Sequence, residues 1–294
     1  MTDEYLAGLN LSNLAETSQQ EIDEHLTWMW TKRGPLYGKA VSALMLDYAP
    51  EFAKLHFRAC RYADHGSNPF RSHPDLVIWS CQNLPSYVML GWETGIANEF
   101  SALRRFGMPK EQIMELVMFA QLYAGMRGLG HVYRAVGDFL PAWGPPEEPL
   151  ATYPEGWEVD PEAFRSGLDL STREMTAADR AALEGWYEQN IGYVPKSIQF
   201  GLKYHPEFVK VNRAKWEVAI RTLPKQCAPY IMLRMNAVSQ NREGIREATL
   251  LCKAWGIKRK YVIQLLNGVV YYFAGFEGFY APADAIDEIL ESYE

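Results

Sequence analysis

Apolar residues recur with helical spacing in both halves of the chain, and the alternation that is typical of strands is almost absent. The segment Glu93–Arg105 is predicted to form an amphipathic helix that Gly107 ends. A second helix is expected to open at Pro109, and a matching helix in the other half to open at Lys258. The apolar positions of these helices are Ile96, Phe100, Leu103, Ile113, Leu116, Val117, Ala120, Val262, Leu265, Leu266 and Val269. This pattern predicts an all-α protein.

The chain also repeats itself once. The segment Tyr48–Lys54 returns as Tyr204–Lys210, with Tyr-x-Pro-Glu-Phe-x-Lys in both copies and a spacing of 156 residues. Three glycines recur in the same order at spacings of 149, 149 and 150 residues: Gly95 and Gly244, Gly107 and Gly256, Gly125 and Gly275. A long period with two copies indicates a duplicated domain rather than a solenoid.

Capping and proline signals set the expected boundaries. Ser18 and Glu21 have the spacing of a capping box, which predicts a helix through Trp30. Pro50 and Pro206 fit the first turns of equivalent helices, and Ser171–Glu174 is predicted to restart helix after a proline-rich stretch. The expected parts are an N-terminal helical segment at 1–33, a first helical repeat at 34–140, a linker at 141–175 and a second repeat at 176–294.

Composition excludes several classes of protein. With 294 residues the chain is long enough for two domains, and its net charge of −7 disfavours nucleic acid as a partner. It has no uncharged apolar run long enough to span a membrane, and Met1–Glu4 is acidic where a signal peptide needs bases. We therefore expect a cytoplasmic protein. Its four cysteines, which form no Cys-x-x-Cys, are expected to be buried thiols: Cys60, Cys81, Cys227 and Cys252.

The repeated unit resembles the carboxymuconolactone decarboxylase and alkylhydroperoxidase D-like superfamily. The likeness rests on an apolar helix, a glycine cap, a Gly-Met-Pro-Lys-Glu-Gln-Ile or Gly-Ile-Lys-Arg-Lys-Tyr-Val opening, and a following helix that reaches Ala-Gly. It covers residues 75–140 and 220–290. The resemblance implies a duplicated all-helical repeat and a homo-oligomer, a dimer or a trimer.

The peroxidase branch of this superfamily carries a Glu, a Cys-x-x-Cys and a His around one pocket. None of the matching positions here holds those residues. The first copy has Ser80, Trp92, Gly95 and Glu99, and the second has Pro229, Asn241, Gly244 and Ala248. Because thiol peroxidase chemistry needs a thiolate beside a resolving thiol, the sequence predicts that this protein is not a thiol peroxidase.

Three side chains of the first copy are the candidate catalytic residues. Glu99 stands where the family has its proton-relay His, and in an apolar cavity its carboxyl could act as a general acid. His131 and Arg127 follow the Ala-Gly turn and have no like residue in the second copy. Histidine suits proton transfer near neutral pH, and a guanidinium binds carboxylates. The alternatives are a solvated or ion-paired Glu99, a surface His131 and a structural Arg127.

Further residues are expected to line the same pocket and bind substrate: Trp92, Glu93, Gly95, Asn98, Tyr123 and Trp79. An interior glycine such as Gly95 indicates either a cavity floor or tight helix packing. In the second copy, the charged group at 242–247 is interpreted as a solvated face, with a second pocket as the alternative. His56, His65 and His73 lack tight ligand spacing, so no metal and no cofactor are expected.

These observations favour a cofactor-free enzyme of the carboxymuconolactone decarboxylase type. Its substrate would be a small carboxylated molecule derived from a ring, of the kind formed in aromatic catabolism. Arg127 would hold a carboxylate or oxyanion, and His131 or Glu99 would supply a proton. Two alternatives remain open: ring opening, isomerisation or hydrolysis in the same pocket, or a non-catalytic binding protein that lost peroxidase activity.

Overall fold

The computed structural model describes residues 5–6, 8–33, 39–59, 62–63, 73–137, 140–144 and 150–293, and most of these are helical. Two short strands, β1 (Tyr5–Leu6) and β2 (Leu9–Asn10), pair antiparallel ahead of the first helix. The helices of the N-terminal half are α1 (Gln19–Arg33), α2 (Lys39–Tyr48), α3 (Pro50–Ala59), α4 (His73–Leu90), α5 (Glu93–Arg105) and α6 (Lys110–Val136). Those of the C-terminal half are α7 (Ala177–Ile191), α8 (Lys196–Tyr204), α9 (Pro206–Val218), α10 (Cys227–Val238), α11 (Arg242–Ala254), α12 (Arg259–Val269), the π-helix η1 (Val270–Ala274), the 3₁₀ helix η2 (Gly275–Phe279) and α13 (Tyr280–Glu291). The all-α expectation is confirmed, and no described helix is long and apolar enough to cross a membrane.

The two halves bend their chains at the same two points. Gly107 and Gly256 both take positive φ, 75° and 73°, and end α5 and α11 as expected. Gly125 kinks α6 at φ 60° and ψ −157°, while Gly275 separates η1 from η2 at φ 57° and ψ −162°. A left-handed φ of this kind favours glycine. These matched bends are consistent with the predicted duplication.

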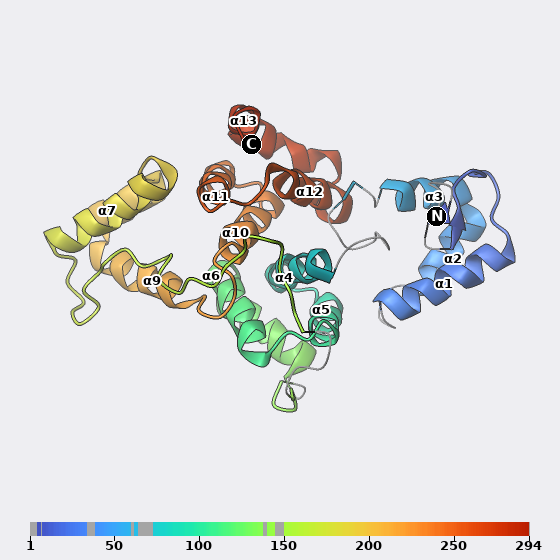
Figure 1. The fold of residues 1–294 in the computed structure, drawn as a ribbon, viewed down its shortest axis with the longest axis horizontal. Coiled ribbons are helices and arrows are strands. Elements are labelled where there is room, and N and C mark those ends of the chain that lie inside the picture. The colour runs from blue at the N-terminus through green and yellow to red at the C-terminus, as the bar shows by residue number, and fades with distance from the viewer. Residues whose placement is uncertain are drawn as a thin grey trace.

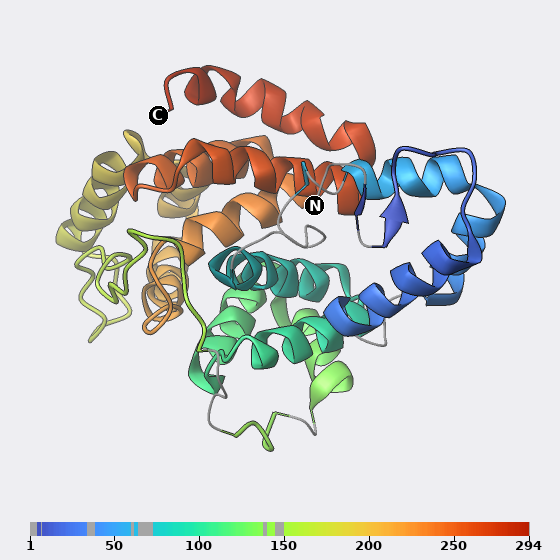
Figure 2. The ribbon, with the colours of Figure 1, turned by 45° about the vertical axis from the view of Figure 1, so that its right-hand side comes forward.

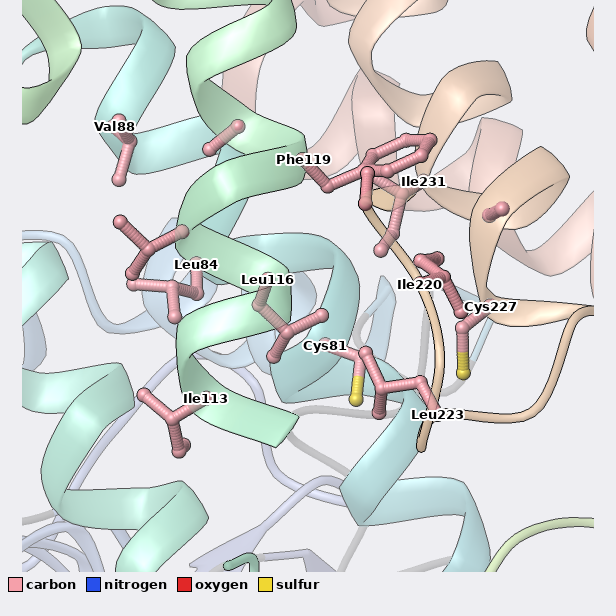
Figure 3. Close-up of a cluster of buried hydrophobic side chains, with 14 of the residues drawn as sticks. Cys81, Leu84, Val88, Ile113, Leu116, Phe119, Ile220, Leu223, Cys227 and Ile231 are labelled. Atoms are coloured by element: carbon pink, nitrogen blue, oxygen red, sulfur yellow. The ribbon is translucent and has the colours of Figure 1, made fainter. Parts of the chain in front are cut away.

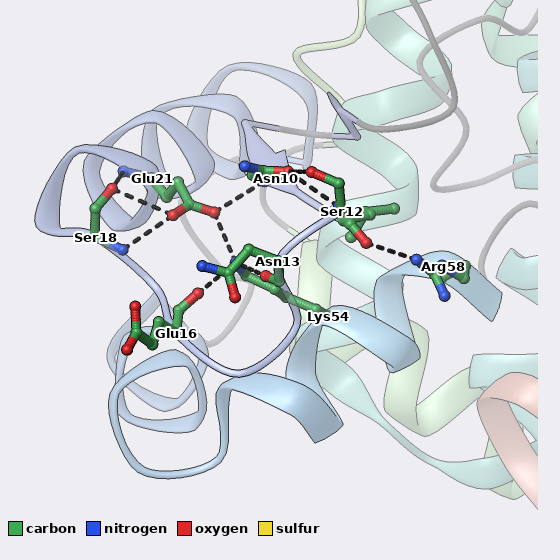
Figure 4. Close-up of polar contacts among 9 residues, drawn as sticks. Asn10, Ser12, Asn13, Glu16, Ser18, Glu21, Lys54 and Arg58 are labelled. Atoms are coloured by element: carbon green, nitrogen blue, oxygen red, sulfur yellow. Dashed lines mark hydrogen bonds and ion pairs between the residues drawn. The ribbon is translucent and has the colours of Figure 1, made fainter.

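A buried lysine anchors the first three helices of each half. Lys54 of α3 is fully buried, and its Nζ donates to the backbone oxygens of Asn13 and Glu16 and to the carboxylate of Glu21 at 2.8 Å (Figure 4). The Ser18–Glu21 capping box is confirmed, since Glu21 N–H donates to Ser18 and Ser18 N–H donates back to Glu21.

The second half repeats this arrangement with different residues. Lys210 of α9 is also buried, and its Nζ donates to the Glu174 backbone oxygen at 2.6 Å and to the Asp179 carboxylate at 2.8 Å. Thr176 and Asp179 form the matching capping box, so α7 begins at Ala177 and not at Ser171. The expectation that Ser171–Glu174 restarts helix is therefore wrong. Ser171 instead donates to Asp169 in a turn, because the side chain of Asp169 offers a local acceptor.

The main hydrophobic core lies between the two halves. Helix α4 packs against α6 of the first half and against α10 of the second, and side chains of all three helices, such as Leu84, Phe119 and Ile231, share one cluster (Figure 3). Cys81 and Cys227 lie in this core, and Cys252 is buried in the neighbouring one, as expected; Cys60 lies outside the described residues. Burial raises the pKa of the Cys227 thiol, which opposes thiolate chemistry.

The first three helices of each half form separate lobes at the two ends of the molecule. Helices α1–α3 lie at one end and α7–α9 at the other, with the core helices between them (Figures 1 and 2). Each lobe has its own small apolar cluster, built around Leu46 and Ala53 in one and Leu183 and Leu202 in the other. The described part of the predicted segment 1–33 thus packs with α2 and α3.

The end of the predicted linker at 141–175 also belongs to a lobe. Ser166 N–H donates to Glu217 of α9 at 3.1 Å, and Asp169 N–H donates to Asp179 of α7 at 2.7 Å. Phe164 is buried beside these helices. This part of the chain therefore helps to position the α7–α9 lobe over the rest of the second half.

Candidate functional site

A cavity of about 430 Å³ lies where the α7–α9 lobe meets α10 and α11. Its described lining residues come from the α7–α9 lobe, the turn at Phe164, helices α10 and α11, and helix α6, which contributes Tyr123. A cavity of this volume suits a small molecule with one or two rings.

Five aromatic rings form one side of the cavity. Phe164 stacks on Trp186 with their centroids 5.9 Å apart, and Tyr187 meets Trp186 edge to face at 5.1 Å. Tyr123 meets Trp216 edge to face at 5.6 Å. Because each ring packs against a neighbouring ring, this wall is preorganised for a ligand.

A buried cation lies in the wall. The guanidinium of Arg213 sits 4.0 Å from the centre of the Trp186 ring, and Nη2 donates to the backbone oxygen of Phe164 at 2.6 Å. Its Nε reaches Glu217 at 3.4 Å and its Nη1 reaches the Tyr187 hydroxyl at 3.5 Å. These last two contacts are long, so the guanidinium retains capacity to interact with an acceptor in the cavity.

Two carboxylates face the cavity from consecutive turns of α11. Glu243 and Glu247 are four residues apart and therefore share one helix face. Burial raises the pKa of Glu247 to about 7, and the negative charge of Glu243 adds to the shift. Glu243 is more exposed, with Lys196 3.9 Å away. Glu247 is therefore a carboxyl that exists in both protonation states near neutral pH.

Two amides and a glycine give the cavity its floor. The Asn241 side chain caps α11 by accepting from Gly244 N–H at 3.3 Å, and it donates to Asn236 at 3.0 Å. Asn236 in turn donates to the Tyr123 hydroxyl at 3.4 Å. A Cβ on Gly244 would collide with the Asn236 amide, so this position needs glycine.

In the first half, aromatic rings fill the corresponding space. Tyr87 and Trp92 occupy the positions that hold Asn236 and Asn241 in the second half, 149 residues away. Their rings meet edge to face at 4.7 Å, and both lie where a Cβ on Gly95 would be. Of the two interpretations of Gly95, tight packing is the one that the structure shows.

The structure brings two of the three predicted catalytic residues, Arg127 and His131, into contact and places Glu99 apart from them. Glu99 is fully buried on α5, whereas Arg127 is exposed on α6. His131 lies near the surface, where Nδ1 is 3.0 Å from Glu93 and Nε2 is 3.4 Å from Arg127 Nε. Glu93 and Glu99 are six positions apart on α5 and so point to different sides of the helix. The expected grouping of Glu99 with His131 and Arg127 is therefore not present.

The predicted substrate-binding residues are also divided. Tyr123 lines the cavity described above. Trp79 and Asn98 are buried, while Trp92 is partly exposed beside Tyr87. The cavity residues that the sequence does not predict lie mainly in the second half. They include Glu243 and Glu247 of the charged segment at 242–247, so this segment lines the second pocket, the alternative to a solvated face.

Of the three histidines that lack the spacing of metal ligands, His56 contacts a tyrosine. His56 Nε2 is 2.6 Å from the Tyr271 hydroxyl, and burial lowers the pKa of this His. His65 lies outside the described residues. Within the described part of the chain, no group of three or more His, Cys, Asp or Glu residues could hold a metal ion.

Comparisons of this chain with protein-family models, with curated proteins and with solved structures found no match.

Proposed function

We propose that this protein is an acid–base enzyme whose substrate, a small ring-derived carboxylate, binds in the cavity of the second half. The observation that carries the proposal is Glu247, a carboxyl with a pKa of about 7 that faces an aromatic-lined cavity. A general acid works best when its pKa lies near the operating pH, and such perturbed groups cluster at functional sites.

The roles follow from the chemistry of each group. Decarboxylation leaves an electron pair on the carbon that carried the carboxylate, and protonated Glu247 would donate its proton to that carbon. Arg213 would attract the substrate carboxylate or an oxyanion through the guanidinium edge that has only long contacts. The ring wall would favour the loss of charge as carbon dioxide leaves.

In this scheme a negatively charged substrate favours the protonated form of Glu247. An anion beside Glu247 raises its pKa further, because like charges disfavour ionisation. A bound carboxylate would therefore keep the acid protonated until it is needed. Decarboxylation is the reaction that the family resemblance implies. Ring opening, isomerisation or hydrolysis would use the same acid in the same cavity.

A panel of small cyclic carboxylates and lactones tests the proposal. Wild-type protein should consume at least one compound, and Glu247→Gln should slow that reaction by about 10²–10⁴-fold, because Gln keeps the shape and removes the proton. Carbon dioxide release and substrate loss, measured together, separate decarboxylation from the other reactions.

Two matched variants make the result specific. Glu243→Gln removes the neighbouring charge while leaving Glu247 in place, so activity should persist with its pH profile moved toward lower pH. His131→Ala changes the surface group of the first half and should leave turnover unchanged. If His131→Ala abolishes turnover while Glu247→Gln does not, the site lies in the first half and the proposal is wrong. Ligand binding with no turnover by any compound of the panel would indicate the non-catalytic alternative.

A further inference from the structure

The two end lobes expose the same row of apolar side chains. We define face 1 as Leu44, Tyr48, Phe52 and Leu55 on α2 and α3, and face 2 as Phe200, Tyr204, Phe208 and Val211 on α8 and α9. Each member of face 1 has its counterpart in face 2, 156 residues later. All eight side chains are between 42% and 80% exposed.

These side chains are exposed although each helix already buries its opposite side. The opposite sides of α3 and α9 are already occupied, since Ala53 and Lys54 are buried in one lobe and Val209 and Lys210 in the other. Each helix pair therefore has a filled inner side and an apolar outer side. Single exposed apolar residues are common, but a continuous row of them marks an interaction surface.

The rings of face 2 already contact one another. Phe200 and Tyr204 have centroids 4.8 Å apart, and the ammonium group of Lys203 lies 5.0 Å from the Tyr204 ring. Face 2 is thus an aromatic surface with a cation beside Tyr204. Such a surface favours a partner that is apolar and carries an acid at the matching point.

Face 1 has that composition. Asp47 precedes Tyr48 in face 1, while Lys203 precedes Tyr204 in face 2, so one repeat position holds opposite charges in the two lobes. Both side chains are exposed.

When two similar surfaces pair through an approximate twofold axis, equivalent residues near the axis meet. This pairing places Asp47 against Lys203, whereas two copies of face 2 would place Lys203 against Lys203. Glu51 and Glu207, which are also equivalent and exposed, carry like charges, so the attraction is confined to the position of Asp47 and Lys203.

We propose that face 1 of one copy of this chain docks onto face 2 of a second copy, with Asp47 opposite Lys203. The two faces lie on lobes at opposite ends of the molecule (Figure 1), so the contact is head to tail. A heterologous contact of this kind forms a ring where the rotation closes and a longer assembly where it does not. The contact does not depend on the proposed activity of the cavity.

Mass measurement of the purified protein by light scattering and sedimentation tests this contact. Wild type should be an oligomer, and either Phe52→Glu or Phe208→Glu alone should yield monomers, since each variant destroys one of the two faces. Met126→Glu, an equally exposed apolar residue on α6, is the matched control and should assemble like wild type. A monomeric wild type, or assembly that survives Phe52→Glu, overturns the proposal.

A mixture of the two single variants distinguishes head-to-tail pairing from like-with-like pairing. The Phe52→Glu chain keeps face 2 and the Phe208→Glu chain keeps face 1, so an equimolar mixture should form dimers that contain one of each and grow no further. Like-with-like pairing would instead leave one variant dimeric by itself, and that result would contradict the proposal.

Charge exchange tests the register. Asp47→Lys and Lys203→Asp should each weaken association about tenfold, because each places like charges opposite one another. The double variant Asp47→Lys with Lys203→Asp should associate as wild type does. If the double variant is weaker than either single variant, the two residues do not face each other and the proposed pairing is wrong.

Discussion

The two halves of this protein share the contacts that stabilise their helices and differ in the side chains that lie between those helices. Both halves place a buried lysine under a capping box, end a helix with a left-handed glycine and bend at an Ala-Gly pair. The second half, however, has Asn236 and Asn241 where the first has Tyr87 and Trp92. Exchanging two rings for two short amides removes side-chain volume beside a glycine that both halves retain. In the second half α7 also packs on α11, whereas the α1–α3 lobe lies at the opposite end of the molecule (Figure 1), so the smaller side chains and the covering lobe together form the cavity.

The largest expected effect on stability comes from the buried lysine that both halves share. Lys210→Met should lower the free energy of unfolding by about 3–5 kcal/mol, because it leaves the buried Asp179 carboxylate without its cation. The matched Lys54→Met should cost less, since Glu21 keeps 16% of its side-chain exposure and water can solvate it. Urea unfolding of both variants measures the comparison.

The pH dependence of this effect has a defined sign. The Lys210 hydrogen bond holds the pKa of Asp179 below its ordinary value of 3.8. Asp179 therefore stabilises the folded state above that pH, and the stabilisation is lost as the pH falls through its folded pKa. The loss of unfolding free energy in Lys210→Met should be largest at neutral pH and should become smaller in acid. A deficit that is constant with pH would mean that lost packing, and not the ion pair, causes it.

Local features of this fold could be predicted from the sequence, and the cavity could not. The capping box at Ser18, the helix ends at Gly107 and Gly256 and the helical class all depend on neighbours within a few positions. Glu247 depends on distant residues, because its burial requires α7 to pack over α11. A charged stretch such as 242–247 has the same composition whether a lobe covers it or water does. Tyr123 is predicted from its residue type and its place beside the Ala-Gly pair, and it does line the cavity.

The second, smaller effect is a pH dependence of folding stability that arises from Glu247 in the second half. Glu247 has its pKa raised from 4.5 to about 7, so the folded state favours the protonated form. Its contribution to stability is complete below pH 4.5 and is lost as the pH rises through 7. Glu247→Gln should therefore match wild type in acid and be more stable by about 2–3 kcal/mol in alkali. Such a gain is typical when a residue serves function at the expense of stability.

The equivalent position in the first half supplies the control for that measurement. Asn98 stands where Glu247 does, 149 residues earlier, and it has no titratable group. Asn98→Ala should change stability by an amount that is the same across the pH range, as followed by thermal unfolding. If Glu247→Gln is also independent of pH, its carboxyl is not perturbed and the acid role fails with it.

The smallest effect on folding, and the most direct test of what opens the cavity, comes from transplanting a ring. Asn236→Tyr places the first-half residue in the second half, where it would fill the space beside Gly244. Binding of benzoate, a ring-bearing carboxylate probe, should weaken more than about tenfold as measured by calorimetry, while unfolding changes by less than about 1.5 kcal/mol because a void is filled. Asn241→Ser keeps an oxygen to cap α11 and adds no bulk, so it should bind the probe as wild type does. If Asn236→Tyr leaves binding intact, or if wild type does not bind the probe while the panel substrate does, then the ligand occupies other space and the volume difference between the halves is not what defines the site.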